Sequence, residues 1–496
     1  MSAPGLMVCG TGSDVGKSRI VAGLCRLFAR RGLRVAPFKA QNMALNSFVT
    51  ETGHEIARSQ ANQAAAACVV PEVAMNPVLL KPTGMMRSQL VVMGRPVGEV
   101  AAGEYAHRNE VLFETVLAAL GELRSRYDLV LAEGAGGAAE INLLEAEIVN
   151  LPLARRAGLP AILVGDIERG GVFASLFGTV ALLPEELAAC LGGFVINKFR
   201  GDKGLLTSGV EEIERRTGLG CLGVLPHLGP LVVDSEDSLA LEQGFAGEGP
   251  VAGEVIDVAV VRLPRLSNFT DFDPLALEPG VRLRYVSTPA ALNGADLVVL
   301  PGSKTTVSDL DWLRRRGFSA AIEAVLAQGG VLLGICAGYQ MLGTVIDDEH
   351  ESRAGRVAGL GLIEVETSFV REKTTRQSRG RDLEGNPVSG YEVHHGLPRS
   401  AESLEPWFVL ERDDGAVPEG VATEQIFATS LHGLFEGDQF RWAFLSGIAR
   451  RRGKSVFVGE MSYESRRQAE IDKVADSLEE NLDLQRLEAV LGEATR

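Results

Sequence analysis

Short apolar runs alternate with segments of helical spacing along the first half of the chain. The run Leu6–Cys9 is followed by Arg19–Arg31, whose apolar residues recur at helical spacing. Five further runs are typical of buried strands: Arg34–Pro37, Leu129–Ala132, Ala161–Val164, Gly193–Ile196 and Cys221–Leu225. Because strands that alternate with helices pair in parallel, this pattern predicts an α/β domain with a mainly parallel sheet covered on both faces.

A second α/β unit is predicted in the second half of the chain. Its expected strands are Val255–Leu263, Ala295–Leu300 and Val331–Ile335. The stretch 238–254 is rich in Gly and Ala and has neither the helical nor the strand period, so we interpret it as a linker. The sequence therefore predicts one domain at 1–237 and a second at 255–450.

The remaining segments carry less information. The charged, glycine-punctuated stretch Asp347–Asn386 predicts loops and short strands. The run Tyr463–Leu491 has apolar residues at helical spacing among many charges. It predicts a helical C-terminal appendage at 451–496, to which we assign no chemistry.

A glycine-rich loop, Gly10-Thr-Gly-Ser-Asp-Val-Gly-Lys17-Ser18, connects the first strand to the first helix. Loop amides and a helix N-terminus bind phosphate oxygens, the Lys of a Gly-Lys-Ser sequence reaches the β/γ-phosphates, and the Ser hydroxyl ligates Mg²⁺. The spacing departs from the standard motif, because Thr11 stands where glycine is usual and glycines occupy positions 10 and 12. We expect a nucleotide site formed by Thr11, Gly12, Ser13, Val15, Gly16, Lys17 and Ser18.

Polar residues follow each of the other main strands of this first domain. Open α/β sheets bind ligands at the carboxyl ends of their strands, so we expect these residues to gather around the glycine-rich loop. They are Lys39, Glu133, Glu140, Glu145, Glu147, Asp166, Glu168 and Asn197. The acids after Glu133 either hold a metal ion, orient a substrate, or are solvated loop residues.

The predicted strand Val331–Ile335 runs directly into Cys336, which is flanked by Gly334 and Gly338 and followed by a helix-compatible run. Strand, sharp turn and helix form the layout of a nucleophile elbow. The amides and positive dipole end of the following helix favour the thiolate, which is the reactive form of cysteine. The alternative is a buried structural cysteine in a strand–helix turn.

A cysteine nucleophile needs a base, which is usually histidine. His432 ends an apolar segment at His-Gly, whereas His394 and His395 lie in a predicted strand that leads into a turn. A base at the end of a strand matches the geometry of an elbow, so we prefer His432. An oxyanion hole needs two N–H donors, and we expect them from Ala337 and the Gly302 region.

Composition and charge argue against several classes of binding partner and cellular location. The chain has 496 residues, 46% hydrophobic and 23% charged, with a formal net charge of −16. This charge argues against nucleic acid or an anionic membrane as a partner. No apolar run reaches the length of a membrane span, and the N-terminus has no basic region typical of a signal peptide. Six cysteines without paired spacing fit a reducing cytoplasm and no structural zinc.

Several long motifs resemble known families. Gly334-Ile-Cys-Ala-Gly-Tyr-Gln-Met-Leu342 with Leu431-His-Gly-Leu-Phe-Glu436 resembles the flavodoxin-like class I glutamine amidotransferase domain, and Gly10–Ser18 with Glu133-Gly-Ala-Gly-Gly137 resembles the dethiobiotin-synthetase-like P-loop fold. The two occur in this order in the cobyrinate/cobyrate amidase family. The cobyrate branch is favoured by these segments: Pro37-Phe-Lys-Ala-Gln-Asn-Met43, Asp166-Ile-Glu-Arg-Gly-Gly-Val-Phe-Ala174, Asn197-Lys-Phe-Arg-Gly-Asp202 and Leu266-Ser-Asn-Phe-Thr-Asp-Phe-Asp-Pro274.

The resemblance implies roles for particular residues. Cys336 is the expected nucleophile and His432 its base. The usual class I pattern is His-x-Glu, but Leu434 stands in the Glu position. We therefore expect a Cys–His dyad and assign no orienting carboxylate, Glu436 included. Lys17 and Lys39 are expected on ATP phosphates, Ser18 and Glu133 near Mg²⁺, and Asn197 on the adenine.

The implied reaction is a ligation with glutamine, ATP and a corrinoid as substrates. Ammonia from glutamine would amidate the four remaining peripheral carboxylates (b, d, e, g) of adenosylcobyrinic acid a,c-diamide through acyl phosphates. The alternatives are a related amidoligase (cobyrinic acid a,c-diamide synthase or a cell-wall lipid amidase) and a P-loop ATPase switch with a non-catalytic amidotransferase module. The sequence leaves the oligomeric state open.

Overall fold

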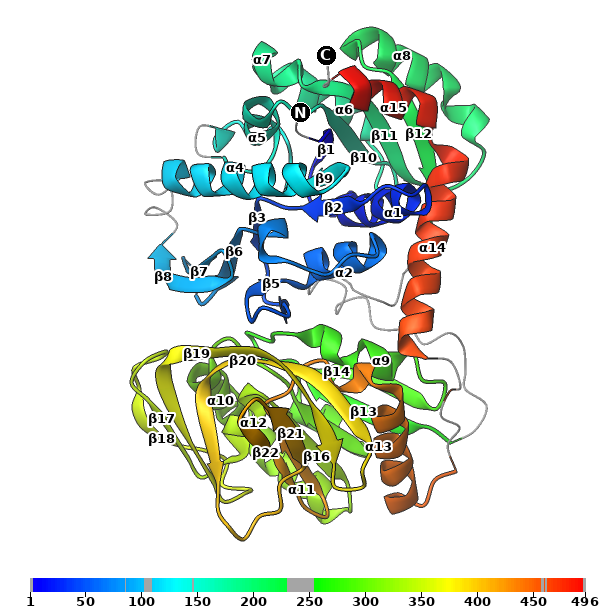
Figure 1. Cartoon of the computed structure of the whole chain (residues 1–496). Helices are drawn as coiled ribbons and strands as arrows, with labels where there is room; N and C mark the ends of the chain where they lie inside the picture. Colours follow the sequence, from blue (N-terminus) through cyan, green and yellow to red (C-terminus); the bar gives the residue numbers. More distant parts are fainter. Residues whose placement is uncertain are drawn as a thin grey trace.

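Six parallel strands form the sheet of the N-terminal lobe in the computed structural model, which describes residues 3–84, 86–101, 109–144, 147–229, 254–455, 459 and 462–493 (Figure 1). They are β1 (Gly5–Gly10), β2 (Val35–Phe38), β9 (Leu129–Glu133), β10 (Ala161–Asp166), β11 (Leu191–Phe199) and β12 (Cys221–Pro226). Their order is β12-β11-β10-β1-β9-β2, with every pairing parallel. The predicted strands and the parallel sheet are thereby confirmed.

Helices cover both faces of this sheet. The apolar stripe of α1 (Lys17–Arg30) is buried, because its aliphatic residues recur at helical spacing and face β1 and β9. The other helices of the lobe are α4 (Asn109–Arg126), α5 (Leu151–Ala157), α6 (Val172–Leu182), α7 (Glu185–Ala188) and α8 (Thr207–Thr217), with η4 at Lys203–Leu206. In the part of the chain that the structure describes, no helix is long and apolar enough to cross a membrane.

A smaller region, inserted between β2 and α4, lies between the N-terminal sheet and the second lobe (Figure 1). It contains β3 (Gln41–Met43), β4 (Ser47–Val49), β5 (Glu55–Ala57), α2 (Arg58–Ala66), η1 (Val73–Met75), β6 (Val78–Pro82), β7 (Arg87–Val92) and β8 (Arg95–Ala101). The β3-β6-β7-β8 sheet and the β4–β5 hairpin are separate from the main sheet. We refer to residues 41–101 of this region as the bridging region.

The second lobe has its own parallel sheet, ordered β14-β13-β15-β16-β24-β23. The strands are β13 (Ile256–Val261), β14 (Val281–Val286), β15 (Leu297–Leu300), β16 (Val331–Ile335), β24 (Ile426–Thr429) and the antiparallel edge strand β23 (Val421–Ala422). If the five parallel strands are numbered along the chain, their order across the sheet is 2-1-3-4-5, which is the flavodoxin-like arrangement. The flanking helices are α9 (Asp273–Ala276), α10 (Thr306–Arg315), α11 (Phe318–Ala327), α12 (Ala337–Leu342) and α13 (Asp438–Arg451), with η6 (Phe269–Phe272), η7 (Pro289–Leu292) and η8 (Leu434–Glu436).

A further sheet of the second lobe corrects one prediction. It contains β17 (Val345–Asp348), β18 (Gly355–Ala358), β19 (Val365–Asp382), β20 (Pro387–Ser400), β21 (Phe408–Arg412) and β22 (Gly415–Glu419). The prediction of only loops and short strands at 347–386 is wrong for β19, which is 18 residues long. Most of its charged residues are exposed along an antiparallel ladder with β20, Lys373 being an exception, while Val365, Thr367 and Phe369 are buried.

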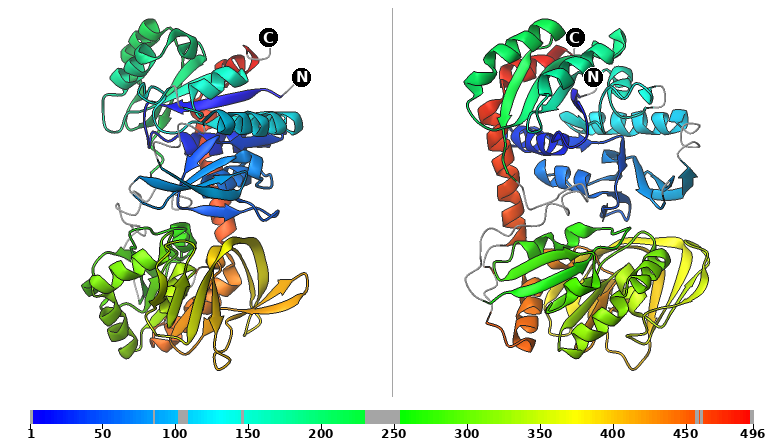
Figure 2. Two further views of the ribbon diagram at one scale, coloured as in Figure 1. Left: turned by 90° about the vertical axis from the view of Figure 1, so that its left-hand side faces the viewer. Right: turned by 180° about the vertical axis from the view of Figure 1, so that it is seen from behind.

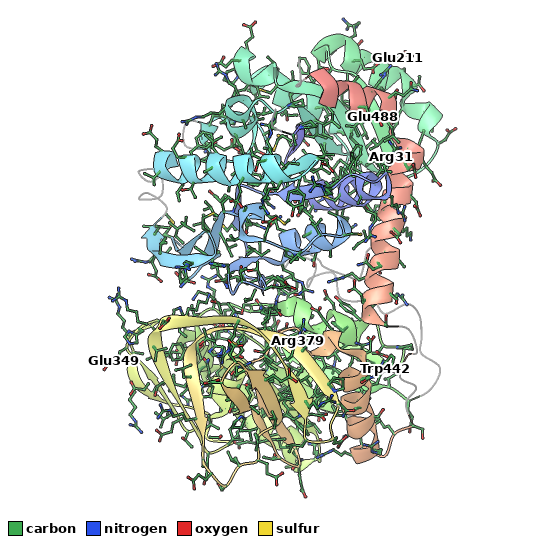
Figure 3. All side chains as sticks on the ribbon, in the orientation of Figure 1. Arg31, Glu211, Glu349, Arg379, Trp442 and Glu488 are labelled. Atoms are coloured by element: carbon green, nitrogen blue, oxygen red, sulfur yellow. The ribbon has the colours of Figure 1, made fainter. Side chains whose placement is uncertain are left out.

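The C-terminal helices return to the first lobe. α14 (Tyr463–Asn481) and α15 (Leu484–Glu493) confirm the predicted helical periodicity, and α14 runs along the flank of the molecule from the second lobe to α1 (Figures 1 and 2). A Cβ at Gly23 of α1 would lie 2.6 Å from a Leu478 methyl carbon, so the two helices approach closely there. Arg31 pairs with Glu488 at 2.9 Å, and both are labelled in Figure 3. Residues 238–253 of the predicted linker lie outside the described residues.

We expect Leu478→Ala to destabilise the N-terminal lobe. Leu478 is 2% exposed, and its loss leaves a cavity between α14 and α1, which costs about 2–4 kcal/mol. The matched change Glu479→Gln, which removes only the exposed pairing with Arg31, should cost less than about 0.5 kcal/mol. Chemical denaturation followed by circular dichroism measures both. Equal effects of the two changes would contradict the packing of α14 on α1.

Candidate active sites

Cys336 lies between β16 and α12, at the carboxyl end of the second sheet. Its backbone has φ 51° and ψ −106°, a conformation that residues other than glycine adopt only under strain. A Cβ at Gly338 would lie 1.9 Å from the Leu300 carbonyl oxygen, so this close approach to the neighbouring strand requires glycine. Strand, strained cysteine and helix form the nucleophile elbow that the sequence predicts.

His432 follows β24, the strand next to β16, and it is 1% exposed. Its Nδ1 lies 2.7 Å from Asp271 Oδ2, and the Gly433 N–H donates to Asp271 Oδ1 at 2.8 Å. Because a carboxylate only accepts, His432 Nδ1 carries the proton of this contact. The Cys336 side chain also acts on the imidazole and raises its pKa. Thiol, imidazole and carboxylate therefore form a connected series, Cys336–His432–Asp271.

The charges of this series favour a reactive sulfur. Burial alone would lower the pKa of His432, but Asp271 and Cys336 together raise it to about 10. His432 is therefore an imidazolium at neutral pH. A cation in contact with the Cys336 sulfur stabilises the thiolate, which is the nucleophilic form.

The carboxylate that orients His432 is the residue that sequence reasoning missed. Asp271 lies in η6, after β13, and 161 positions separate it from His432. Glu436, which follows His432 closely, instead pairs with Arg58 at 2.6 Å. A usable signal was present, because Leu266–Pro274 is a polar run at the carboxyl end of a predicted strand. The same criterion located the polar residues of the first domain.

The two other candidate bases have different surroundings. His394 Nδ1 lies 2.7 Å from the Gly396 carbonyl oxygen, and His395 Nδ1 lies 3.1 Å from that of Val370. Burial, Lys373 and Lys304 lower the pKa of His395 to about 4. His395 is therefore neutral at pH 7, and the contact with Cys336 favours His432 as the base.

The two predicted oxyanion donors lie beside the series. Ala337 is the first residue of α12, directly after Cys336, and Gly302 follows β15, which pairs with β16. A Cβ at Gly302 would lie 2.9 Å from His432 Cε1, so this backbone is adjacent to the imidazole. Their N–H groups remain the predicted oxyanion hole.

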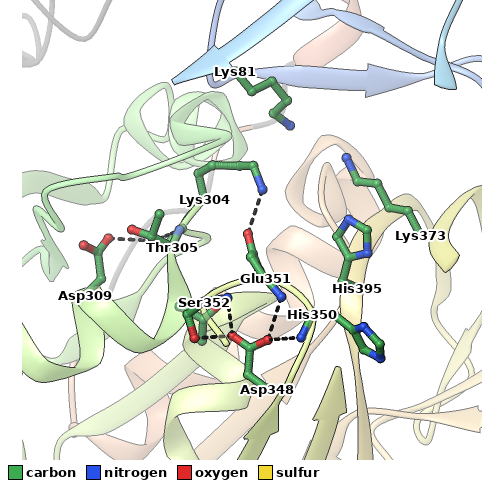
Figure 4. A network of polar contacts seen from close by, with 12 residues as sticks. Lys81, Lys304, Thr305, Asp309, Asp348, His350, Glu351, Ser352, Lys373 and His395 are labelled. Atoms are coloured by element: carbon green, nitrogen blue, oxygen red, sulfur yellow. Dashed lines mark hydrogen bonds and ion pairs between the residues drawn. The ribbon is translucent and has the colours of Figure 1, made fainter. Parts of the chain in front are cut away.

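Basic residues gather where the two lobes meet (Figure 4). Lys81 of the bridging region and Lys373 of β19 both pair with the buried Glu55 at 2.6 Å. Burial opposes ionisation of Glu55, but the two ammonium groups hold the pKa of its carboxyl well below the usual range. Lys304, two residues after Gly302, pairs with Glu351 at 2.7 Å and points toward the same region. A buried ion cluster thus joins the lobes beside the thiol site.

Glu133 is the centre of the site in the first lobe. Its Oε1 accepts hydrogen bonds from Ser18 Oγ and from Lys39 Nζ, both at 2.8 Å, and its Oε2 accepts one from Gln63. Lys17 Nζ donates to the Gly12 carbonyl at 2.8 Å and to the Gly136 carbonyl at 2.9 Å. The structure therefore brings Lys17, Ser18, Lys39 and Glu133 together, as the sequence predicts for a nucleotide site. Gln63 was not predicted.

Asn197 and Gly137 contact the backbone of the rest of the glycine-rich loop. Asn197 Nδ2 donates to the Val15 carbonyl at 2.8 Å, and a Cβ at Gly16 (φ 98°) would lie 2.3 Å from that nitrogen. Thr11 forms a bridge with Gly137, while Gly12 is partly exposed and Ser13 is exposed. Asn197 thus touches the loop backbone, and its contact with adenine stays a prediction.

The predicted acids lie on both flanks of the loop. Asp166 pairs with Lys198 at 2.8 Å, and Glu168 pairs with Arg200 at 3.1 Å. Glu140 is exposed, whereas burial raises the pKa of the Glu147 carboxyl to about 7. Asp166 and Glu168 therefore have structural partners, and Glu147 also accepts hydrogen bonds from Asn150. Glu147 remains a substrate-side candidate, and Glu145 lies outside the described residues.

We expect Asp271→Asn to slow the alkylation of Cys336 by iodoacetamide at pH 7. Without the carboxylate, the pKa of His432 falls, so less imidazolium lies beside the sulfur and the alkylation slows. Each unit lost from the pKa of His432 should slow the reaction by at most about tenfold. The rate is read by peptide mass mapping, with the exposed Cys68 as internal control. An unchanged Cys336 rate would show that Asp271 does not stabilise the ion pair.

Comparison with known proteins agrees with this pair of sites. Residues 6–232 match the model of the CobQ/CobB/MinD/ParA nucleotide binding domain, and residues 257–440 match that of the CobB/CobQ-like glutamine amidotransferase domain. The cobyric acid synthase of Rhodococcus jostii is 50% identical over 98% of this chain and 95% of its own length. That of Desulforudis audaxviator is 50% identical over 99% of this chain and 100% of its own length. The chain belongs to the cobyric acid synthase family.

Proposed function

We propose that this chain is a C–N-bond-forming ligase that amidates carboxylates of a corrinoid with ammonia taken from glutamine. The observation that carries the proposal is the presence, in one chain of this family, of a Cys336–His432–Asp271 series and a P-loop site centred on Glu133. The proposed substrate is adenosylcobyrinic acid a,c-diamide, with amidation of its b, d, e and g carboxylates to give adenosylcobyric acid.

The first half-reaction releases ammonia in the second lobe. The Cys336 thiolate attacks the side-chain amide carbon of glutamine, and the N–H groups of Gly302 and Ala337 stabilise the oxyanion. His432 then gives its proton to the departing amino group, which leaves as NH₃ from a thioester. Water, deprotonated by His432, hydrolyses the thioester to glutamate, and the sulfur leaves as the Cys336 thiolate beside the restored imidazolium. Asp271 holds the imidazole in the orientation that both proton transfers need.

The second half-reaction activates a carboxylate in the first lobe. A carboxylate resists ammonia because its carbon is shielded by negative charge and it has no leaving group. Transfer of the γ-phosphoryl group of ATP to one oxygen gives an acyl phosphate and ADP, and attack by NH₃ gives the amide and phosphate. Lys17 and Lys39 neutralise phosphate charge during the transfer. Glu147 and Glu140 are proposed on the side of the substrate.

The residues at Glu133 fit a magnesium ion. Mg²⁺ prefers hard oxygen ligands and is held in nucleotide sites by one or two protein groups besides the phosphates and water. The Ser18 hydroxyl and the Glu133 carboxylate, 2.8 Å apart, supply such a pair. Bound there, Mg²⁺ would neutralise charge on the β- and γ-phosphates.

All six cysteines are free, so we infer a reducing cytoplasmic location.

We expect Cys336→Ala to abolish amidation with glutamine but to retain amidation with ammonium salts. The change removes the nucleophile, so the glutamine-dependent rate should fall at least about 10³-fold, while the P-loop site is intact. Mass spectrometry of the corrinoid products, in which each amidation exchanges a hydroxyl for an amino group, measures both. Cys190→Ala is the matched control. Loss of the ammonium-dependent reaction as well would refute the division of labour.

The complementary change is Glu133→Gln. It weakens the group that holds Ser18 and Lys39 and would ligate Mg²⁺, so amidation with either nitrogen source should fall roughly 10²- to 10³-fold. Release of glutamate from glutamine should continue, because the thiol site is untouched. Glu212→Gln on the surface helix α8 is the control. Full amidation by the Glu133 variant would exclude Glu133 from the ATP site.

A further inference from the structure

The turn that carries Asp271 is held by the other lobe. Asn46, at the start of the bridging region's β4, accepts the Phe269 N–H on its Oδ1 at 3.1 Å. In return, Asn268 Oδ1 accepts the Ser47 N–H at 3.2 Å. Each asparagine side chain thus binds the backbone of the residue that follows its partner. Asn46, Ser47 and Asn268 are all less than 5% exposed, so water does not compete for these bonds.

Asn268 is the point from which the Asp271 turn begins. It has φ 53°, in the left-handed region that asparagine tolerates better than most residues, and it precedes η6. The Asp271 N–H donates to the Asn268 carbonyl at 3.0 Å, which closes the turn. The position of the Asp271 carboxylate therefore depends on the conformation of Asn268, whose side chain is bound to Ser47.

Tyr391 makes a second connection, this time to His432. Its hydroxyl donates to the Ser47 carbonyl at 2.8 Å and accepts from Asn268 Nδ2 at 3.0 Å. Its ring stacks on the His432 imidazole, with centroids 5.6 Å apart, and its other neighbour is the ring of Phe48, also at 5.6 Å. The backbones of Tyr391 and His432 also exchange two hydrogen bonds. Residues 46–48 thus contact the residues that position both the imidazole of His432 and the carboxylate of Asp271.

A third contact joins the same two regions. Arg58, at the start of α2, pairs with Glu436 in η8, directly after the His432 turn. The Arg58 N–H also donates to the Asn46 carbonyl at 3.2 Å. Five residues further along α2, Gln63 donates to Glu133 in the P-loop site. Residues 46–63 therefore touch the thiol site at one end and the nucleotide site at the other.

We propose that Asn46 is a positioning residue for the Cys336–His432–Asp271 series, so that the amidating lobe completes the geometry of the glutamine-hydrolysing one. The inference rests on the proposed function. Asn46 touches no reacting atom and acts through Phe269 and Asn268 on Asp271. A misplacement of a catalytic group by about 1 Å can cost 10²-fold in rate. Loss of one buried clamp is thus enough to slow glutamine hydrolysis without touching the thiol.

The test compares Asn46→Leu with Asn46→Asp in the full-length chain. Leucine has a similar size but no acceptor for the Phe269 N–H, whereas aspartate keeps one. For Asn46→Leu we expect kcat for glutamine hydrolysis to fall roughly 10- to 100-fold, with KM little changed. The alkaline limit of activity, set by the raised pKa of His432 near 10, should move to lower pH because Asp271 no longer holds the imidazolium. Asn46→Asp should restore most of the rate.

Tyr391→Phe provides a second, independent variant in the other lobe. It keeps the ring that stacks on His432 but removes the hydroxyl bound to Ser47 and Asn268. We expect kcat for glutamine to fall in the same direction. Amidation with ammonium salts should persist in all three variants, which shows that the fold and the P-loop site are intact. If Asn46→Leu also loses the ammonium-dependent amidation, the kcat of Tyr391→Phe for glutamine hydrolysis decides whether the contact with residues 46–48 positions the series.

The outcomes distinguish failure of the proposed function from failure of the positioning role of Asn46. If the unmodified chain releases no glutamate from glutamine, the proposed function fails. If it does, and Asn46→Leu and Tyr391→Phe hydrolyse glutamine with unchanged kcat and pH profile, the function stands and the positioning role is refuted. A fall in kcat that Asn46→Asp does not restore, with no shift of the alkaline limit, would also refute it, because it would indicate a packing effect alone.

Discussion

The buried contact between Asp271 and His432 is the interaction on which the proposed glutamine site depends. A carboxylate that is 3% exposed is costly unless its oxygens are satisfied, and here one accepts from imidazole and the other from the Gly433 N–H. This joins the loop after β13 to the loop after β24, on either side of the strained Cys336. In a sheet of 2-1-3-4-5 order the crevice between the first and third strands is the usual ligand site, and Asp271 lies at that end.

Much of this arrangement was predictable from the chain. The runs that become β1, β9, β10, β13 and β16 are buried on both faces, so they read as continuous apolar segments. The glycine-rich loop and the cysteine elbow are local features, because their chemistry needs glycine at fixed offsets from the reactive residue. His432 was also within reach, since a histidine at the end of an apolar run indicates a strand end. Lys39 and Glu133 followed from the same rule about strand ends.

What could not be predicted is pairing between distant segments. Asp271 meets His432 across 161 positions, and the Asn46–Phe269 and Ser47–Asn268 contacts span 223 and 221. No local pattern specifies such partners. β19 escaped notice for a different reason: its exposed side is densely charged, which obscures the alternation that marks a strand. The strands β3, β4 and β5 of the bridging region have three residues each, which is too short for an alternation of apolar and polar residues to be recognised.

The return of α14 and α15 to the first lobe makes the second lobe an insertion within the first. Leu478, Leu487 and Val490 belong to the same apolar cluster as β1 and α1, although they follow the whole second lobe in the chain. Domains usually fold in order from the N-terminus as they leave the ribosome. Here the N-terminal core cannot close until α14 and α15 emerge. The glutamine-hydrolysing lobe is therefore the first that can fold to completion. Until α14 and α15 are synthesised, part of the apolar surface of the P-loop lobe stays uncovered.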